Sequence, residues 1–366
     1  MDADRDTRSH LTLWTTWAPI ATVPVLVAGW GRSIPVLVAL LVAVLLGAAV
    51  LAAVHHAEVV AHRVGEPFGS LVLAVAVTVI EVGLILTLSA SGGEAAQTLG
   101  RDTVFAAVII TCNGIVGASI LAGSRRGPVV FNAEGAGSAL ATVAILAGVC
   151  LVLPTFTTST PGPQFSTQQL IFAGVASLAL YVLFVLTQTG RHRDFFLPVD
   201  ESGALLATDH AEPPSLKQTG ISAVLLLVSL VGVVGLAKVE SKSLESLVAA
   251  AGLPQAVVGV VIAVVVLAPE TLAAVRAARR GKMQISLNLA YGSAMASVGL
   301  TVPVLAVATV WMNAPLLLGL TPVHILLFAL TIVTGALTVV PGRATRLQGG
   351  LHLALLAAYL FLSANP

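Results

Sequence analysis

Long runs of apolar residues, separated by short polar stretches, dominate this chain. A helix that crosses a lipid bilayer needs about 20 mostly apolar residues, and eleven runs approach this length. The runs are continuous, whereas strands of a membrane barrel would alternate between apolar and polar positions, so helices are favoured. We therefore predict an all-α polytopic membrane protein with about eleven transmembrane helices. The predicted spans are residues 14–30, 33–54, 66–90, 101–123, 134–154, 168–189, 218–238, 252–275, 285–311, 316–340 and 347–364.

The composition agrees with a lipid environment. Charged residues make up 10% of the 366 residues and hydrophobic residues 57%, whereas soluble globular proteins carry about 25% charged residues. So few charges exclude a soluble enzyme, a nucleic-acid binder and a disordered chain, and the net charge of +1 gives no reason to expect a nucleic-acid partner. Cys112 and Cys150 both lie in apolar runs, so neither a disulfide framework nor a metal–thiolate site is expected.

The basic residues indicate an orientation. With eleven spans, 14 of the 18 Lys and Arg residues fall on one side of the membrane. By the positive-inside rule this side is cytoplasmic, so we expect the N-terminus in the cytoplasm and the C-terminus outside. A signal peptide is the competing interpretation of the N-terminus, but the acidic start fits it poorly. The residues on the expected cytoplasmic side are Arg5, Arg8, Arg63, Arg125, Arg126, Arg191, Arg193, Lys217, Arg276, Arg279, Arg280, Lys282, Arg343 and Arg346.

The spans suggest an internal duplication. One long polar segment, residues 190–217, is preceded by five spans and followed by five, once the first is set aside. Five spans per half place the second half upside down relative to the first, which is the inverted repeat of many secondary transporters. We predict an N-terminal tail and first helix (1–31), a first half (32–189), a cytoplasmic linker (190–217) and a second half (218–366). A flexible linker is favoured over a regulatory or ion-sensing role for 190–217.

Two carboxylates interrupt the apolar spans. Glu81 lies about 15 residues into its span, roughly 22 Å along a helix and so near mid-membrane, and Glu270 follows Pro269 in a span of Val, Ile and Ala. An intramembrane carboxylate is costly unless it faces a cavity, binds a cation or takes up a proton. A protonated side chain hydrogen-bonded between helices is the structural alternative. Two carboxylates neutralise one divalent cation, so calcium or magnesium could compete with protons here.

Other polar residues could complete such a site. Asn113, Ser119, Asn288 and Ser293 lie at mid-depth in the spans that follow the two glutamates, where each could be a cation ligand or a helix–helix hydrogen bond. Glu66, near the expected cytoplasmic surface, is a candidate gate, with an ordinary N-terminal helix charge as the alternative. A histidine group beside it, with Glu58, is a hypothetical pH sensor, against the alternative of an interfacial polar patch. Its members are His55, His56 and His62.

These motifs resemble a known family. The segments resemble the two alpha repeats of bacterial calcium/proton antiporters, most closely the ChaA type of the cation/calcium exchanger superfamily. The segments are Gly65-Glu66-Pro67-Phe68-Gly69-Ser70 with Val79-Ile80-Glu81-Val82, Ala268-Pro269-Glu270-Thr271-Leu272 with 286–294, and 339–345. The resemblance implies eleven helices with two inverted five-helix halves, in a bacterial-type inner (plasma) membrane. It also implies proton-driven exchange of calcium, sodium or potassium by alternating access, with Glu81 and Glu270 binding cation or proton and Asn113, Ser119, Asn288 and Ser293 as neighbouring ligands.

Other functions are less well supported. A passive cation channel is the main alternative, and transport of another divalent cation such as magnesium is a second. The sequence has neither a His-Glu-x-x-His motif nor a phosphate-binding loop, so we expect a transporter rather than an enzyme, without ATP drive or a bound cofactor. His324 and His352 are interpreted as packing residues. The expected partners are the transported cations, protons and lipid, and self-association into a homo-oligomer is left open.

Overall fold

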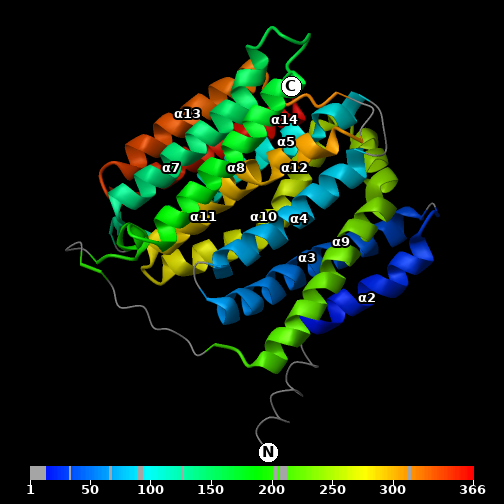
Figure 1. The fold of residues 1–366 in the computed structure, drawn as a ribbon, viewed down its shortest axis with the longest axis horizontal. Helices are drawn as coiled ribbons and strands as arrows, with labels where there is room; N and C mark the ends of the chain where they lie inside the picture. Colours follow the sequence, from blue (N-terminus) through cyan, green and yellow to red (C-terminus); the bar gives the residue numbers. More distant parts are fainter. Residues whose placement is uncertain are drawn as a thin grey trace, which may run out of the picture. The chain divides into compact units, whose positions relative to one another are not determined.

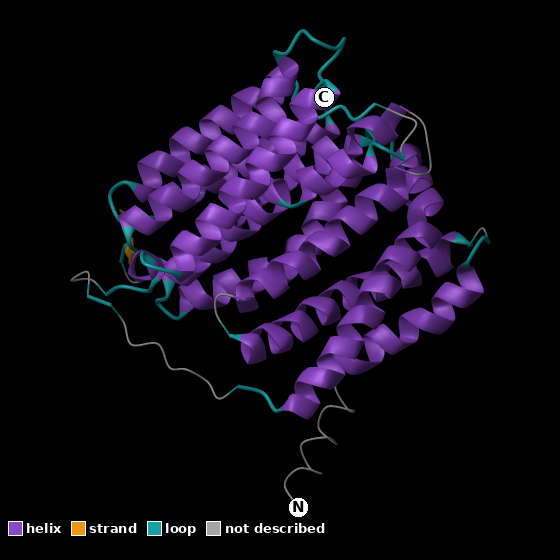
Figure 2. Cartoon of the chain, viewed as in Figure 1, coloured by secondary structure: helices purple, strands orange, loops and turns teal. Residues whose placement is uncertain are grey.

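The computed structural model is an assembly of long helices, which confirms the predicted all-α membrane fold (Figures 1 and 2). It describes residues 14–32, 34–65, 68–89, 94–125, 127–200, 204–205, 213–311 and 315–366. Ten helices in these ranges are long and apolar enough to cross a membrane. The first predicted span, residues 14–30, corresponds to α2 (Trp14–Gly29), which has only 16 residues. The strands of the described residues, β1 (Val129–Val130) and β2 (Arg343–Ala344), pair antiparallel, with Val129 opposite Ala344.

The chain divides into two compact units, which group helices from both predicted halves. Unit 1 comprises residues 1–96 and 210–252. It contains α2, α3 (Val36–Val64), α4 (Phe68–Ser89) and α9 (Leu216–Ala250). The long α9 packs against each of the other three helices. Glycines allow this close packing, because a Cβ atom on Gly232 would collide with Thr22 of α2 and one on Gly83 of α4 would collide with Val234.

Unit 2 comprises residues 97–209 and 253–366. In its central span, residues Gln97–Gly123, 83% of the apolar stretch that could cross the membrane is buried inside the protein. The corresponding share is at most 61% in the other spans of this unit. Three segments form this span without a break, and α10, α11 and α14 pack around it. The helices are α5 (Glu94–Ile109), the π-helical η1 (Ile110–Ile115), α6 (Val116–Gly123), α7 (Ala133–Ala147), the π-helical η2 (Gly148–Val152), the 3₁₀ turns η3 (Leu153–Thr155) and η4 (Arg193–Phe196), α8 (Thr167–Thr189), α10 (Ala256–Arg279), α11 (Met283–Gly299), α12 (Thr301–Ala308), α13 (Pro322–Val339) and α14 (Arg346–Ala364).

Capping residues fix several helix ends. The Ser166 hydroxyl accepts a hydrogen bond from the Gln169 backbone N–H while the Gln169 side chain accepts one from the Ser166 N–H, and Ser215 and Gln218 make the same pair at the start of α9. Such capping boxes satisfy backbone donors that a helix end leaves without partners. Between α10 and α11, Gly281 has a φ angle of +76°, which only glycine adopts readily, so the chain turns sharply there.

Two helices extend well beyond their predicted limits. The span predicted at 33–54 continues as α3 to Val64, so the histidine group lies in the last turns of α3 and not at the start of the next span. The span predicted at 218–238 continues as α9 to Ala250. The extensions, residues 55–64 and 239–250, are rich in polar residues but contain no proline or glycine, so the helix continues through them.

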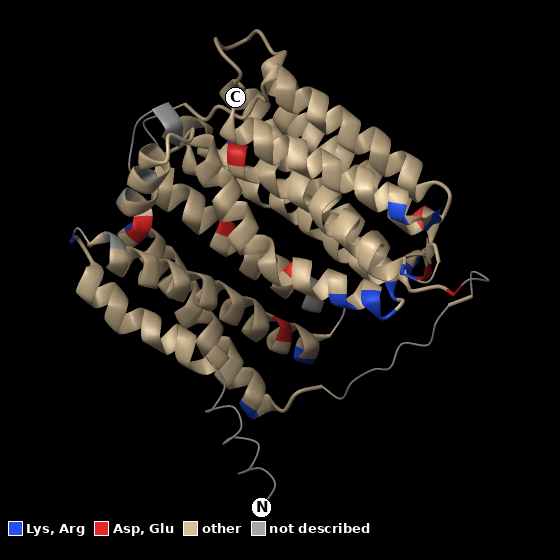
Figure 3. Cartoon of the chain, turned by 180° about the vertical axis from the view of Figure 1, so that it is seen from behind, with Lys and Arg blue, Asp and Glu red and all other residues tan. Residues whose placement is uncertain are grey.

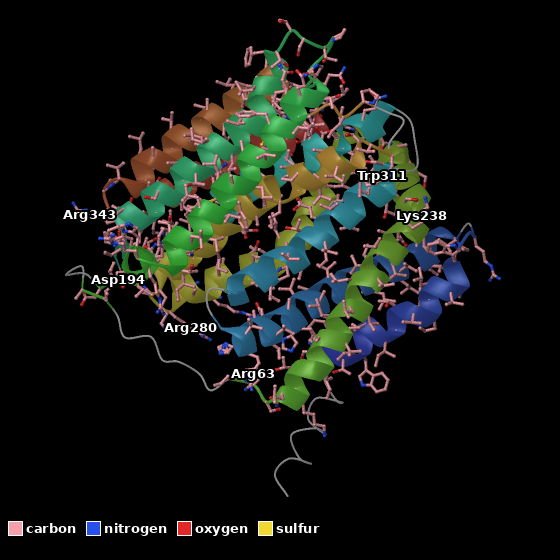
Figure 4. All side chains as sticks on the ribbon, in the orientation of Figure 1. Arg63, Asp194, Lys238, Arg280, Trp311 and Arg343 are labelled. Carbon is pink, nitrogen blue, oxygen red and sulfur yellow. The ribbon has the colours of Figure 1, made fainter. Side chains whose placement is uncertain are left out.

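Charged residues lie mostly at helix ends (Figure 3). In unit 2, Arg280, Arg343 and Asp194 lie at one end of the helices and Trp311 lies at the other (Figure 4). In unit 1, Arg63 and Lys238 lie at opposite ends (Figure 4). The middle parts of the helices are therefore mainly apolar, as expected for helices embedded in lipid.

The contact between α6 and α14 gives a test of the packing. A Cβ atom on Gly117 would lie 2.9 Å from the backbone oxygen of Gly349 and 3.0 Å from Cβ of His352. We expect Gly117→Ala to lower stability by about 1–3 kcal/mol, because the neighbouring atom is backbone and overpacking is not easily relieved. Thermal melting of the purified protein in detergent measures this. Gly137→Ala in α7 is the control, since a Cβ there meets nothing within 4 Å; equal losses in both variants would contradict the packing described.

Candidate functional site

Glu270 lies in a helix that packs against the most buried span of unit 2. It is in the middle of α10, and its side chain is 7% exposed. Helix α10 packs against η1, α6 and α11, which are the segments that carry the other predicted site residues of this unit. Glu270 therefore lies in a helix that contacts polar segments of both predicted halves.

The local backbone of α10 is modified next to Glu270. The helix runs from Ala256 to Arg279 through Pro269. Proline has no N–H group, so the Val265 carbonyl one turn earlier lacks its usual helical donor. The Thr271 hydroxyl donates to the Leu267 carbonyl at 2.7 Å. Proline thus leaves one backbone oxygen of this turn available without breaking the helix.

Two buried hydroxyl groups in the surrounding helices have no hydrogen-bond partner among the described residues. They belong to Ser119 in α6 and Tyr291 in α11, both 0% exposed. A buried hydroxyl without a partner is energetically unfavourable, so such a group is a candidate for a functional role. Helix α11 is fixed against α10 by Ser286, whose hydroxyl donates to the Ala274 carbonyl at 2.6 Å. Unit 2 therefore supplies two hydroxyl oxygens in the helices that pack against the helix of Glu270.

Asn113 is held in a buried polar network. It lies in the π-helical turn η1, and such turns are frequent at functional sites. Its Nδ2 donates to the Thr331 hydroxyl at 2.9 Å, and its Oδ1 lies 3.1 Å from Nδ1 of His352. On the other side of the imidazole, Nε2 lies 3.1 Å from the Thr338 hydroxyl. The network holds the Asn113 carboxamide between α13 and α14. His352 therefore has a hydrogen-bonding role in addition to the predicted packing role.

Asn288 is engaged differently from Asn113. Its Nδ2 donates to the Phe196 carbonyl at 2.7 Å, and its Oδ1 accepts a bond from Gln284 at 3.0 Å. Gln284 in turn accepts a bond from the Asn132 backbone N–H at the start of α7. Asn288 therefore attaches the polar linker, through η4, to α11. Ser293, one turn further along α11, is half-buried.

Glu81 is the corresponding carboxylate of unit 1. It lies in α4 and is 4% exposed. One turn earlier, the buried Thr78 hydroxyl has no hydrogen-bond partner among the described residues. Neither α2 nor α4 contains a basic residue within its limits. The carboxylate therefore lies in an apolar helix bundle with a polar hydroxyl nearby, as Glu270 does in unit 2.

The three residues of the histidine group lie in different environments. His56 is buried, with Nδ1 3.2 Å from the Ser222 hydroxyl and Nε2 3.0 Å from the Thr15 carbonyl. His55 is half-buried and its ring lies 5.3 Å from that of His56, whereas His62 is exposed. Glu66 lies outside the described residues. His56 thus ties α3 to α2 and α9, and the pH-sensing role of the group remains a prediction.

No preformed cluster of strong metal ligands is present in the described part of the chain. No group of three or more His, Cys, Asp or Glu residues there could hold a metal ion. The candidate ligands in α10 and in the segments packed against it are mainly carboxylate, hydroxyl, amide and carbonyl oxygens. Such oxygens suit hard cations such as calcium or sodium more than transition metals.

Comparison with known proteins identifies the family. The model of the sodium/calcium exchanger protein family matches residues 33–190 and 221–365. The chain belongs to this family. It is 34% identical to the sodium-potassium/proton antiporter ChaA of Escherichia coli over 93% of both chains. It is also 43% identical to protein y4hA of Sinorhizobium fredii over 98% of both.

Solved structures of exchangers share the fold. YfkE has a TM-score of 0.70 at 18% identity, with 95% of this chain and 98% of that chain covered. The sodium–calcium exchanger NCX_Mj has a TM-score of 0.55 at 19% identity, with 89% and 99% covered. The protein is therefore an integral membrane member of the cation/calcium exchanger superfamily, and the resemblance noted in its sequence motifs is confirmed.

Several buried polar residues of this exchanger were not among the predicted site residues. Thr331, Thr338 and His352 complete the network of Asn113, and Tyr291 adds a buried hydroxyl. One signal was present in the sequence, because Thr331 and Thr338 are seven residues apart and so lie on one face of an apolar helix. Their partner His352 is in another helix, and its pairing required the structure.

The network around Asn113 can be tested through Thr331. Thr331→Val keeps the shape of the side chain but removes the acceptor for Asn113 Nδ2. We expect a loss of about 1–3 kcal/mol of stability, since the buried amide is left without its partner. Thermal melting should show this loss. The matched control is Thr142→Val in α7, where an exposed hydroxyl likewise donates to its own helix, at 2.8 Å; similar melting temperatures for both variants would show that the network contributes nothing.

Proposed function

We propose that this exchanger is a secondary antiporter that moves protons against Ca²⁺, Na⁺ or K⁺ by alternating access. In this proposal Glu81 and Glu270 bind either a cation or a proton, in competition. The observation that carries it is the burial of these two carboxylates, which are 4% and 7% exposed in the middle of apolar helices. Each lies in the second span of its half, so both halves supply the same chemistry at matching positions.

The negative charge of the two buried carboxylates favours coupled exchange. A carboxylate in a membrane interior is strongly destabilised unless a cation or a proton neutralises it. The charge of two glutamates is balanced by one calcium ion, by two monovalent cations or by two protons. The protein can then switch between its inward-facing and outward-facing states only when cations or protons neutralise both carboxylates, because the empty charged state is too costly. It must therefore exchange one set of ions for another, which makes it an antiporter.

The relatives favour the same reaction. ChaA is named a sodium-potassium/proton antiporter and YfkE a Ca²⁺/H⁺ antiporter. These names agree on protons as one of the exchanged ions and differ in the cation. We therefore assign proton coupling first, and leave calcium, sodium and potassium as the candidate cations, with magnesium as the alternative.

The neighbouring polar residues receive different roles in this proposal. Ser119 is the best candidate for an additional ligand, because its buried hydroxyl has no partner among the described residues. Asn113 and Asn288 already use both ends of their carboxamides, so they shape the site and contribute at most a remaining lone pair. Ser293 completes the candidate set, and the histidine group with Glu66 is assigned to regulation at the entrance.

The orientation follows from the basic residues. We place the N-terminus in the cytoplasm of a bacterial-type cell and the C-terminus outside, because 14 of 18 Lys and Arg residues then lie on the cytoplasmic side. In this orientation α4 and α9 both run outward from the cytoplasm. Proton entry from outside would then drive cation export.

The carboxylates give the direct test of this function. Glu81→Gln and Glu270→Gln are each expected to reduce coupled exchange at least a hundredfold, since the amide can neither release a proton nor neutralise a cation. Proton flux driven by a cation gradient in proteoliposomes measures this. Glu134→Gln is the control, because Glu134 is exposed in the first turn of α7. Near-normal exchange in either variant, at equal protein levels, would refute the mechanism.

The cation is determined by a second experiment. Gradients of calcium, sodium, potassium and magnesium are applied separately to proteoliposomes that contain the wild-type protein and a pH-sensitive dye. We expect one or more of the first three to move protons in the opposite direction, because oxygen donors with two carboxylates suit these ions. Cation flux without proton movement would indicate a passive channel instead.

A further inference from the structure

A carboxylate other than Glu81 is also buried in a candidate membrane span of unit 1. Glu240 lies in α9, within the span Leu216–Ser241, and is 7% exposed. Its exposed fraction equals that of Glu270, although it lies beyond the predicted span 218–238. Because α9 continues to Ala250 without a break, Glu240 belongs to the helix bundle and not to a loop.

No counter-charge pairs with Glu240 among the described side chains. Its Oε1 is buried without a hydrogen-bond partner, and no ion pair involves this residue in the described part of the chain. Lys238 is exposed, two residues away, and side chains at this spacing point to different sides of a helix. A buried carboxylate without a protein partner requires a cation or a proton from elsewhere.

The helices packed against α9 do not supply that charge. The helix α2 contains no titratable residue, and those of α3 lie in its last ten residues, toward the end marked by Arg63. The α4 helix contributes Glu81. Lys238 marks the opposite end of unit 1 from Arg63 (Figure 4). Arg32 is near in space, because Gly29 packs against Val239, but its side chain is exposed. Lys242 and Glu245 are near in the sequence, and their side chains are not described.

The depth of Glu240 relative to Glu81 follows from one contact. Gly83 of α4 packs directly against Val234 of α9, so these two residues lie at the same level. Glu81 precedes Gly83 by two residues, and Glu240 follows Val234 by six. Both helices begin on the same side in the proposed orientation, so at 1.5 Å per residue Glu240 lies roughly 12 Å further outward than Glu81.

We propose that Glu240 is an outer ion-binding carboxylate, through which the transported cation passes between Glu81 and the external side, and which holds a proton when the cation is absent. This inference rests on the proposed antiport function. A step of about 12 Å from mid-membrane reaches nearly to the surface of a 30 Å hydrocarbon core. A carboxylate there shortens the distance over which an ion would otherwise meet only apolar side chains.

The test compares the two faces of the membrane. In proteoliposomes with a single protein orientation, we expect Glu240→Gln to raise the apparent KM for calcium or sodium at the outer face at least fivefold. The KM at the inner face should change less than twofold, because that path does not include Glu240. Glu240→Asp, which keeps the charge, should restore most of the outer-face affinity, and Glu134→Gln should match the wild type.

The results of this test distinguish a failure of the role proposed for Glu240 from a failure of the proposed antiport function. An unchanged KM at both faces, or an equal rise at both, would overturn the role of Glu240 while leaving antiport intact. If the wild type shows no proton-coupled exchange, the proposed function itself fails, and this inference with it.

A second measurement uses the unaltered protein and so does not depend on the folding of a variant. Dicyclohexylcarbodiimide reacts with protonated carboxyl groups in apolar surroundings, and mass spectrometry locates the product. We expect a product at Glu240 whose yield falls at least threefold when millimolar calcium or sodium is added. No product, or a yield that neither cation changes, would contradict the proposal.

Discussion

The burial of carboxylates among apolar helices is the constraint on which the rest of this exchanger depends. Charge in the membrane interior is costly, so nearly all charged residues lie at helix ends, where they set the orientation. Glu81 and Glu270 are exceptions in the middle of their helices, with Glu240 further out in α9. Their neutralisation by cations or protons connects the composition of the chain to the reaction that we propose.

The polar groups of unit 2 divide into those that are fully bonded and those that are not. Asn113, His352 and their threonine partners form a closed network that stabilises the π-helical turn, and Asn288 attaches the linker to α11. The hydroxyls of Ser119 and Tyr291 are buried without partners in the described structure. Unit 2 therefore combines hydrogen-bonded polar residues with two hydroxyl groups whose hydrogen-bonding capacity is unused, which is the combination that the proposed ion site needs.

The sequence predicted the architecture well because lipid imposes a simple rule, a run of about 20 apolar residues per span. The same rule drew attention to Glu81 and Glu270, because each places a carboxylate inside an otherwise apolar run. Helix ends were less predictable, since polar residues extend α3 and α9 beyond the hydrocarbon, and Glu240 was overlooked for this reason. The partners of Asn113 could not be predicted, because Thr331 and His352 are more than 200 residues away in the chain.

Competition between cations and protons for the buried carboxylates is the central claim, and proton release from the purified protein tests it most directly. Calcium or sodium is added to weakly buffered protein in detergent, and the pH is recorded. The account predicts that the wild type releases protons on cation binding, in an amount that saturates with concentration, and that the double variant Glu81→Gln, Glu270→Gln releases none. Saturable cation binding without proton release, or equal release from the double variant, would contradict it.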